Sequence, residues 1–302
     1  MEIYAEKEEG LMKYHEVTAK GILSAGGGMN LYRGCSHGCI YCDSRSSCYQ
    51  MDHEFEDIEV KANSLQLLED ALSRKRTKCM IGTGSMADPY IPLEKELKYT
   101  RRALELIAKY RFGATLITKS DLVLRDLDIL QEINSKTKAV VQMTLTTADE
   151  ELCKIIEPGV CTTSRRYEVL KELRQAGVPT VVWMTPILPY INDTRENIQA
   201  LLNMCVDAGV RGIIWFGAGV TMREGNREYF FRQLDRHFPG MKERYLHDFG
   251  LNYVCSSPRE KELSAMVKET CEKQGIMYGP DQVFAYLKEF EDRTSGEQLS
   301  LF

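Results

Sequence analysis

The sequence lacks the features that mark membrane, secreted and fibrous proteins. It contains no apolar run of about 18 residues, the length that a transmembrane helix needs. Its first residues, "MEIYAEKEEGLMKYHEV", are too acidic and too often interrupted by charge for a secretory or transit signal. No internal repeat and no low-complexity segment is visible in the sequence. These absences predict a globular protein in the cytoplasm that has no membrane partner.

An excess of positive charge is also missing. The 302 residues include 39 Lys and Arg against 44 Asp and Glu, so the formal net charge is -5 at pH 7. Non-specific affinity for nucleic acids comes mainly from clustered Lys and Arg, so this balance argues against a large phosphate-binding surface and leaves only a local basic patch. The hydrophobic share of 43% and the charged share of 27% are ordinary for a globular protein with a large core.

From residue 79 onward, short β-branched apolar runs alternate with longer amphipathic stretches, a pattern typical of strand-helix units and a parallel sheet. A first strand near "GGMNLYRG" precedes five others, which are "CMIGTG", "ATLITK", "AVVQMTLT", "TVVWMTPIL" and "GIIWFGAG". Helices are predicted over "SLQLLEDALSR", "EKELKYTRRALELIAKY", "SDLVLRDLDILQEI", "SRRYEVLKELRQAG" and "TRENIQALLNMCVDAG". This order favours an α/β fold of the partial (β/α)6 TIM-type barrel kind over an open doubly wound sheet.

Polar residues at the ends of the predicted strands support the barrel. Cys35 follows the first strand, Ser85 follows the second, Lys119 ends the third and Thr144 lies near the end of the fourth. Active sites of such barrels lie at the carboxyl ends of the strands. We expect the barrel over residues 1–225, a helical C-terminal extension over 226–292 and a flexible tail over 293–302.

Three of the ten cysteines, Cys35, Cys39 and Cys42, lie within "GCSHGCIYC" and are spaced as C-x3-C-x2-C. Because the cytoplasm keeps thiols reduced, closely spaced cysteines there more often bind metal or carry out redox chemistry than form disulfides. One explanation is a structural zinc site with His37 or Cys48 as the fourth ligand, although such sites usually combine two C-x2-C pairs. Another is a cubane iron-sulfur cluster, which has four ligands when it only carries electrons. With three protein thiolates, one iron of that cluster stays open for a substrate or cofactor.

The motif "CSHGCIYC" resembles the cluster loop of the radical S-adenosylmethionine (SAM) superfamily, whose pattern is C-x3-C-x-aromatic-C, with Tyr41 in the aromatic position. Further stretches, among them "GSMADPYIPLE", "LITKSDLVLRDLDIL" and "IEPGVCTTSRRYEVLKELRQAGVPTVVWMTPILPYIND", resemble the branch that includes spore photoproduct lyase. The resemblance implies a [4Fe-4S] cluster on Cys35, Cys39 and Cys42, an open iron that chelates SAM, and reductive cleavage of SAM to a 5'-deoxyadenosyl radical. It also implies a reductant such as flavodoxin or ferredoxin.

The same resemblance implies contacts with SAM, residue by residue. Tyr41 would pack near the adenine, Ser85 would meet the methionyl amino group, and Lys119 would meet the carboxylate. Each position also has a plainer explanation, since a serine hydroxyl can cap a turn and a lysine at a strand end is often only solvated. For Lys119 we favour the binding role, because a side chain at that strand end would point over the rim of the barrel.

Three further positions complete the implied SAM site. Thr144 matches a small hydroxyl residue that reaches the ribose or the carboxylate, and Pro186 and Ile187 would line the adenine as an apolar wall. Arg166 matches an arginine that pairs either with the SAM carboxylate or with Glu157. The alternatives are a β-branched strand residue for Thr144 and an ordinary helix-surface charge for Arg166.

The substrate implied by the resemblance is a nucleic acid or nucleotide. Spore photoproduct lyase repairs a thymine adduct in DNA and returns a hydrogen atom through a cysteine in the loop after the second strand. Here that position is Ser85, and the nearest thiol, Cys79, lies before or inside the strand. A serine O–H bond is too strong to give hydrogen readily to a carbon radical, which argues against photoproduct repair itself and leaves other DNA repair open. The competing hypothesis is a zinc- or cluster-stabilised, DNA-associated binding protein without radical chemistry.

The last five residues, Gln298 to Phe302, resemble the short motif by which bacterial repair and replication proteins dock on the DNA sliding clamp. In that motif a glutamine and apolar anchors at the end of a flexible segment fill a pocket on the partner. The alternative is an apolar tail that folds back onto the protein. The resemblance implies the sliding clamp as a partner through this tail.

Overall fold

A seven-stranded sheet forms the centre of the computed structural model, which describes residues 13–84 and 86–294. Its strands follow the order β12-β9-β8-β7-β6-β5-β2, and each neighbouring pair is parallel. Their bounds are β2 (Gly28–Met29), β5 (Met80–Thr83), β6 (Gly113–Thr118), β7 (Ala139–Thr144), β8 (Thr180–Trp183), β9 (Gly212–Ile214) and β12 (Met277–Tyr278). The predicted α/β fold with a partial TIM-type barrel is confirmed.

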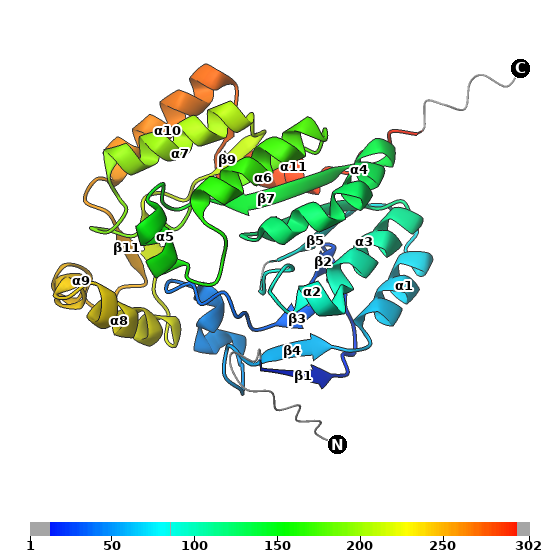
Figure 1. The fold of residues 1–302 in the computed structure, drawn as a ribbon, viewed down its shortest axis with the longest axis horizontal. Coiled ribbons are helices and arrows are strands. Elements are labelled where there is room, and N and C mark those ends of the chain that lie inside the picture. The colour runs from blue at the N-terminus through cyan, green and yellow to red at the C-terminus, as the bar shows by residue number, and fades with distance from the viewer. Residues whose placement is uncertain (1–12, 85, 295–302) are drawn as a thin grey trace, which may run out of the picture.

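Helices lie along an arc on the outer side of this sheet (Figure 1). In chain order they are α1 (Ser64–Arg74), α3 (Tyr99–Lys109), α4 (Leu127–Lys136), α6 (Thr163–Gln175), α7 (Arg195–Ala208) and α10 (Glu260–Gln274). Helix α7 shows how the sequence sets their ends. Thr194 caps its first turn by accepting a hydrogen bond from the Asn197 backbone N–H, and Gly209 ends it in the left-handed conformation with φ 64°.

Helix α11 (Pro280–Lys288) packs on the inner face of the sheet, where Lys138, just before β7, donates to its Tyr286 carbonyl at 2.9 Å. Val283 and Leu287 of α11 pack in one buried cluster with Val140 of β7, Val181 of β8 and Ile214 of β9. Side chains of a strand alternate between faces, so residues two and four positions later on these strands point inward as well. The inner face is therefore closed by apolar side chains at this end.

The inner face becomes polar toward the carboxyl ends of the strands. Gln142 donates from Nε2 to Thr115 Oγ1 at 2.8 Å, and Trp183 donates from Nε1 to Gln142 Oε1 at 2.7 Å. Thr144 follows Gln142 by two residues on β7 and so points to the same face. This gradient from apolar to polar leads directly to the site described below.

Two smaller sheets flank the barrel. The first has the order β1-β4-β3, with β1 (Tyr14–Val17), β4 (Ile58–Lys61) and β3 (Tyr32–Arg33), and the second pairs β10 (Gly219–Thr221) with β11 (Val254–Ser256) in antiparallel fashion. Between β10 and β11 run α8 (Asn226–His237) and α9 (Met241–Phe249). The short helices are η1 (Asp43–Arg45), η2 (Ser47–Tyr49), α2 (Glu94–Leu97), η3 (Asp121–Asp126) and α5 (Glu150–Ile156).

The observed elements differ from the predicted ones in several places. The helix predicted over residues 94–110 divides at Lys98, whose φ is +54°, into α2 and α3. The stretch predicted as the first strand divides into β2, which joins the large sheet, and β3, which joins the small one. After residue 225 the chain adds helices and also β11 and β12, and β12 extends the large sheet beside β9. The predicted clamp motif, Gln298 to Phe302, lies outside the described residues. Over residues 13–84 and 86–294, no helix combines the length and the apolar character needed to cross a membrane.

Candidate active site

A cavity of about 660 Å³ opens at the carboxyl ends of the parallel strands. Small-molecule sites typically occupy ~300–1,000 Å³, so this volume suits a cofactor together with part of a substrate. Five neighbouring strands contribute to its lining, with Gly84 and Asp88 after β5, Lys119 after β6, Thr144 on β7, Trp183 on β8 and Phe216 after β9. The cavity is thus at the edge of the sheet where barrels of this type place their chemistry.

The loop that carries the three clustered cysteines forms one wall of this cavity. Cys35, Cys39 and Cys42 all line it. The loop begins at Gly34, whose φ is +83° and where a Cβ atom would lie 2.6 Å from the Phe55 carbonyl oxygen. Only glycine tolerates both conditions. That same carbonyl accepts a hydrogen bond from the Cys35 N–H at 3.0 Å, which fixes the start of the loop.

The turn between α5 and α6 supports the loop from its other side. The Ile40 N–H donates to the Ile156 carbonyl at 3.0 Å, and the Gly159 N–H donates to the His37 carbonyl at 2.8 Å. A Cβ atom at Gly159 would lie 2.6 Å from the His37 carbonyl oxygen, so the two segments approach as closely as glycine allows. The cysteine loop, residues 34–42 (also called the cluster loop below), is therefore held by a part of the chain that lies far away in sequence.

The charges around the three thiols differ from one thiol to the next. All three cysteines are free of disulfides. Burial raises the pKa of the Cys39 and Cys42 thiols, because an apolar surrounding disfavours the thiolate. Burial acts on Cys35 in the same direction, but the neighbouring His37 outweighs it and lowers the pKa of that thiol. The Lys119 ammonium also favours the thiolate forms of Cys39 and Cys42, and thiolates are the forms that bind metal.

A buried ion pair lies directly behind the loop. Arg166 and Glu157 are both inaccessible to solvent, and Arg166 Nη2 lies 2.5 Å from Glu157 Oε2. Tyr41 donates its hydroxyl hydrogen to the same carboxylate. Burial disfavours the ionised form of Glu157, but Arg166 outweighs burial and lowers the pKa of this carboxyl. Arg166 also donates to the Thr144 carbonyl at 2.7 Å, so one guanidinium links the cluster loop to the end of β7.

Lys119 stands at the rim between the cluster loop and Asp88. Its Nζ lies 5.8 Å from the centre of the Tyr41 ring. Burial disfavours the ammonium form, yet the carboxylates and thiols around it, above all Cys39 and Glu157, outweigh burial and raise the pKa of Lys119. The lysine is therefore a cation that faces the cavity.

Asp88 is held in place by three hydrogen bonds. It accepts from Thr118 Oγ1 at 2.7 Å, from the Lys119 N–H at 2.8 Å and from the Tyr90 N–H at 2.8 Å. His37 Nδ1 lies 3.5 Å from Asp88 Oδ2. These bonds connect the loop after β5 with the end of β6, so Asp88 is presented rigidly to the cavity.

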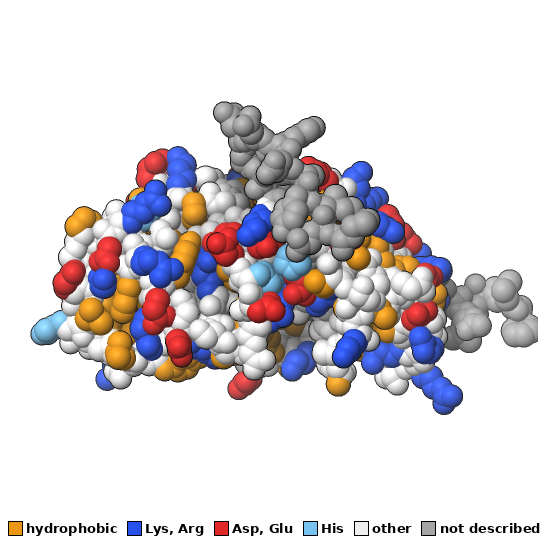
Figure 2. All heavy atoms as spheres, turned by 90° about the horizontal axis from the view of Figure 1, so that it is seen from below, with side chains coloured by type: hydrophobic (Ala, Val, Ile, Leu, Met, Phe, Trp, Pro, Cys, Tyr) orange, Lys and Arg blue, Asp and Glu red, His pale blue; other side chains and the backbone are white. Residues whose placement is uncertain are grey.

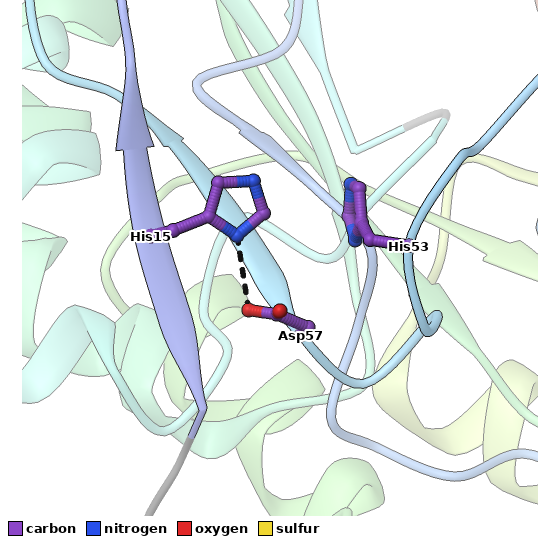
Figure 3. Close-up of side chains that lie close together, drawn as sticks. All are labelled: His15, His53 and Asp57. Carbon is purple, nitrogen blue, oxygen red and sulfur yellow. Dashed lines mark hydrogen bonds and ion pairs between the residues drawn. The ribbon is translucent and has the colours of Figure 1, made fainter. Parts of the chain in front are cut away.

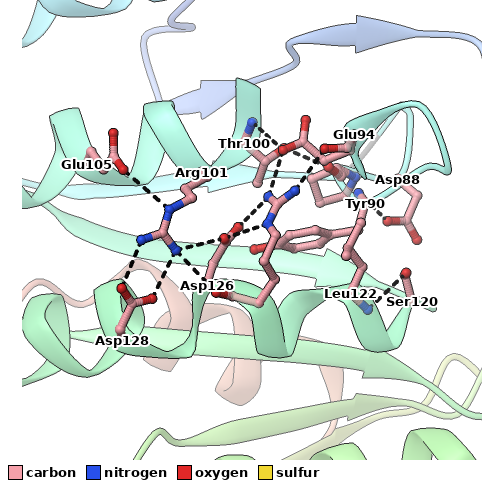
Figure 4. A network of polar contacts seen from close by, with 12 residues as sticks. Asp88, Tyr90, Glu94, Thr100, Arg101, Glu105, Ser120, Leu122, Asp126 and Asp128 are labelled. Atoms are coloured by element: carbon pink, nitrogen blue, oxygen red, sulfur yellow. Dashed lines mark hydrogen bonds and ion pairs between the residues drawn. The ribbon is translucent and has the colours of Figure 1, made fainter. Parts of the chain in front are cut away.

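Behind Asp88, the chain is fixed by a network of ion pairs (Figure 4). Arg125 lies 2.8 Å from Glu94 and 2.7 Å from Asp126, and both carboxylates are fully buried. Arg101 extends the network through Asp126 at 3.3 Å and Asp128 at 2.9 Å. The network joins the loop after β5 to η3 and so immobilises the segment from which Asp88 projects.

The structure brings several of the predicted residues to the cavity. The three cysteines line it together with Tyr41, Lys119, Thr144 and Pro186. Arg166 does not line the cavity. Of its two predicted partners it pairs with Glu157, and both side chains are buried. Ile187 is fully buried in the main hydrophobic core, because neighbouring side chains of an extended segment point in opposite directions, and its predicted place in the cavity wall is corrected. Ser85 lies outside the described residues.

Other lining residues were not predicted. Trp183 ends β8 and Phe216 lies just after β9. Both therefore agree with the expectation that functional side chains lie at the carboxyl ends of the strands. Val254 and Glu260 come from the region after β10, and no local pattern in the sequence indicates them. Glu260 accepts hydrogen bonds from the Ala218 N–H and from Ser264, the latter at 2.5 Å, which anchors this region to the rim.

The profile of the radical SAM superfamily matches residues 29–202 of the chain. The chain belongs to the radical SAM superfamily. This radical SAM chain is similar to an uncharacterized protein of Mycobacterium tuberculosis, with 30% identity over 225 residues that make up 72% of this chain and 65% of that protein. An uncharacterized protein of Methanocaldococcus jannaschii is 35% identical over 169 residues, which are 55% of this chain and 62% of that protein. The chain thus spans less than two thirds of the length of these relatives.

Among solved structures, a spore photoproduct lyase variant with bound AdoMet and dinucleoside spore photoproduct is similar, with a TM-score of 0.61. It covers 83% of this radical SAM chain and 74% of its own at 15% identity, which shows a shared fold. The superfamily implies SAM and an iron-sulfur cluster. The residues present fit both, because three free thiols lie on the wall of one cavity whose volume suits a small molecule.

Proposed function

We propose that Cys35, Cys39 and Cys42 hold a [4Fe-4S] cluster and that the enzyme acts on a nucleic acid or a nucleotide. The observation that carries this proposal is that three free thiols and the Lys119 ammonium line the same cavity. Three thiolates leave one iron of such a cluster without a protein ligand. When bound and reduced, the cluster supplies the electron that cleaves SAM to a 5'-deoxyadenosyl radical.

The spacing of the sulfur atoms supports a cluster over a single zinc ion. Thiolates on one tetrahedral zinc lie about 3.8 Å apart, because each Zn–S bond is about 2.3 Å long. Among the described residues, three potential ligand atoms come within 4.8 Å of one another only at His15, His53 and Asp57. The sulfur atoms of the cluster loop are therefore spread more widely than that limit. A cluster requires such a spread, since its protein ligands bind different irons.

The chain's own residues then bind and orient SAM. Lys119, charged and facing the cavity, is suited to the SAM carboxylate through a charge-assisted hydrogen bond. Thr144 offers a hydroxyl at the end of β7, the strand next to β6, and Tyr41 and Pro186 offer flat apolar surface to the adenine. Asp88, to which the sequence analysis gave no role, accepts a hydrogen bond from the Lys119 backbone N–H on this wall and is suited to the methionyl ammonium.

The outer rim of the cavity supports a planar substrate. Phe216 is 57% exposed and Val254 is 52% exposed, and both line the cavity mouth. Next to them, Tyr253 is 48% exposed and lies 5.3 Å beneath the guanidinium of Arg223. Exposed aromatic rings with an arginine are the surface on which nucleobases stack, at about 1–3 kcal/mol per base. The chain's negative net charge then restricts contact with phosphates to this rim.

Photoproduct repair itself is not proposed. Cys79 directly precedes β5, whereas the cavity lies at the other end of that strand. A hydrogen atom can be donated only over contact distance, so this thiol is on the wrong side of the strand for the reaction. We propose instead a substrate radical that is quenched or rearranged by another route, with electrons delivered by a flavodoxin or ferredoxin.

Anaerobic reconstitution tests the proposal. We expect about four irons per chain, and 5'-deoxyadenosine on reduction in the presence of SAM. Each of Cys35→Ala, Cys39→Ala and Cys42→Ala should lose both signals. Addition of single-stranded DNA, duplex DNA or nucleotides should then change the rate of 5'-deoxyadenosine formation for the class that contains the substrate.

Cys48→Ser is the matched control. Cys48 is exposed and close in sequence to the loop, and it is one of the residues that could complete a zinc site. Retention of iron and activity in this variant is expected. Stoichiometric zinc in place of iron, together with loss of the metal in Cys48→Ser, would establish the binding protein without radical chemistry and overturn the proposal.

A further inference from the structure

Two histidines and an aspartate converge on the small sheet of β1, β4 and β3, away from the cysteine loop (Figure 3). One ring nitrogen each of His15 and His53 and one carboxylate oxygen of Asp57 lie within 4.8 Å of one another. His15 Nδ1 is 3.0 Å from Asp57 Oδ1, and the two imidazole rings meet edge to face with centroids 4.7 Å apart. Histidine and acidic side chains lie side by side near the middle of the face that Figure 2 shows.

The fold brings these residues together from three short segments. His15 lies on β1, which pairs in parallel with β4 so that His15 stands opposite Glu59. Asp57 directly precedes β4, and His53 comes from the loop after η2. On β4, Ile58 and Val60 are buried in the core while Glu59 and Lys61 face outward. The histidines and the carboxylate therefore gather on the polar side of the sheet and not in its core.

The hydrogen bonds of His53 leave one of its nitrogens available as a ligand. Its Nδ1 lies 3.0 Å from the Glu54 carbonyl oxygen, to which only an N–H can donate. The lone pair is consequently on Nε2. That atom is buried, has no hydrogen-bond partner among the described residues, and lies 3.7 Å from Glu59 Oε2. Metal-binding histidines characteristically donate one ring N–H to a backbone carbonyl and keep the other nitrogen for the metal.

We propose that His15, His53 and Asp57 bind a divalent first-row transition metal such as zinc. Two imidazoles and one carboxylate are a ligand set that zinc accepts with one position left to water. Nitrogen ligands of tetrahedral zinc lie about 3.3 Å apart, so small side-chain rotations bring the donors into place. Lys13 Nζ lies 3.5 Å from Asp57 Oδ2 and 3.3 Å from Glu54 Oε2, and its side chain is 62% exposed, so Glu54 can keep the ammonium when a metal binds Asp57.

A metal at this site would hold residues 53–57 in place, the segment to which the first residue of the cysteine motif, Cys35, is hydrogen-bonded. Phe55 lies between His53 and Asp57 in the chain, and its carbonyl oxygen accepts the hydrogen bond of the Cys35 N–H. The ion would tie this segment to β1 and hold that carbonyl in position. The site is separate from the cluster loop, and the inference does not depend on the proposed function.

Zinc binding by the protein of residues 1–302 tests the site. The cluster is first reconstituted without oxygen, and the enzyme is then equilibrated with Zn²⁺ alone, passed through a desalting column and analysed for zinc. We expect about one zinc per chain in addition to the iron. His53→Ala should lose this zinc, and Asp57→Asn should raise its dissociation constant at least about tenfold. His247→Ala should leave it unchanged, because His247 forms an exposed pair with Asp248 at 2.7 Å that no third ligand joins among the residues the structure describes.

Two further measurements protect the test against misfolding and against thiol binding. Zn²⁺ should raise the melting temperature of the wild type but not of the milder variant His53→Gln, because an ion stabilises only the state that binds it. Co²⁺ should bind without the intense sulfur-to-metal absorption of a thiolate site. Zinc content that His53→Ala does not reduce, or a thiolate absorption with Co²⁺, would refute the proposal.

Discussion

Replacing Arg166 with methionine isolates the buried ion pair behind the cysteine loop. Methionine keeps much of the length and apolar volume of the side chain and removes only the guanidinium. In the wild type that guanidinium lies 2.5 Å from Glu157 and donates to the Thr144 carbonyl at 2.7 Å and to the Cys161 carbonyl at 3.0 Å. All three acceptors lose the arginine in Arg166→Met, and Glu157 keeps the hydrogen bond from Tyr41.

The size of the effect follows from burial. Glu157 has no exposed surface in its side chain, so water cannot replace the lost arginine. Removal of one partner from a buried ion pair costs about 3–5 kcal/mol of unfolding free energy. Globular proteins have about 5–15 kcal/mol in total, so the variant should lose a large fraction of its stability. At about 2–4 °C per kcal/mol, the melting temperature should fall by roughly 6–20 °C.

The neighbouring residue provides the matched control. Arg165 also forms two ion pairs, with Asp121 at 3.1 Å and Glu172 at 2.8 Å, but its side chain is 40% exposed. Arg165→Met should therefore cost at most about 1 kcal/mol. Thermal melting of both variants, under the same anaerobic conditions, gives the comparison. The double variant Glu157→Gln/Arg166→Met should recover much of the loss, because no unpaired charge remains. Equal melting temperatures for the two single variants would refute the reasoning.

Three more expectations follow from the same site. Glu157→Gln should have a lower unfolding free energy than the wild type near neutral pH, and this difference should shrink in acid. The pKa of Glu157 lies below its ordinary value of 4.5, so the ionised carboxylate stabilises the fold fully above that pH and less as the pH falls further. Urea unfolding at several pH values would record this change. Lys119→Met should weaken SAM binding about 10- to 100-fold while the iron content stays constant, with partial rescue by Lys119→Arg, and an unchanged KM for SAM would contradict the assigned contact. Phe216→Ala should raise the KM for a nucleic acid or nucleotide substrate about 5- to 100-fold without altering SAM cleavage in its absence, and equal loss of both would point to a structural role.

The barrel and the cluster loop can be predicted from the sequence because their signals are local. An apolar run such as "AVVQMTLT" is continuous in the chain, and β7 covers its first six residues. The three cysteines lie within eight positions, from Cys35 to Cys42, so their spacing is readable without a structure. Strand ends then converge on one edge of a parallel sheet as a matter of geometry, which is why Lys119 and Thr144 were found.

Contacts between distant segments could not be predicted in this way. Arg165 and Arg166 are adjacent and chemically identical, yet one is 40% exposed and the other fully buried. Arg166 shares the buried face of α6 with Val169 and Leu170, and only the position of Glu157 in the preceding turn gives it a partner there. The contributions of Val254 and Glu260 to the cavity likewise depend on how the chain after β10 returns to the rim, which has no short-range signal.

The hydrogen bonds that hold the cysteine loop also set the order in which the protein can mature. Tyr41 reaches a carboxylate 116 positions later in the chain, and the backbone of Ile40 is bonded to that of Ile156. A ribosome must therefore release more than half of the polypeptide before the thiols acquire their final arrangement, since a chain folds only as far as it has been synthesised. If these thiols hold the proposed cluster, we expect iron and sulfide to be delivered late, to a largely assembled barrel and not to a nascent peptide.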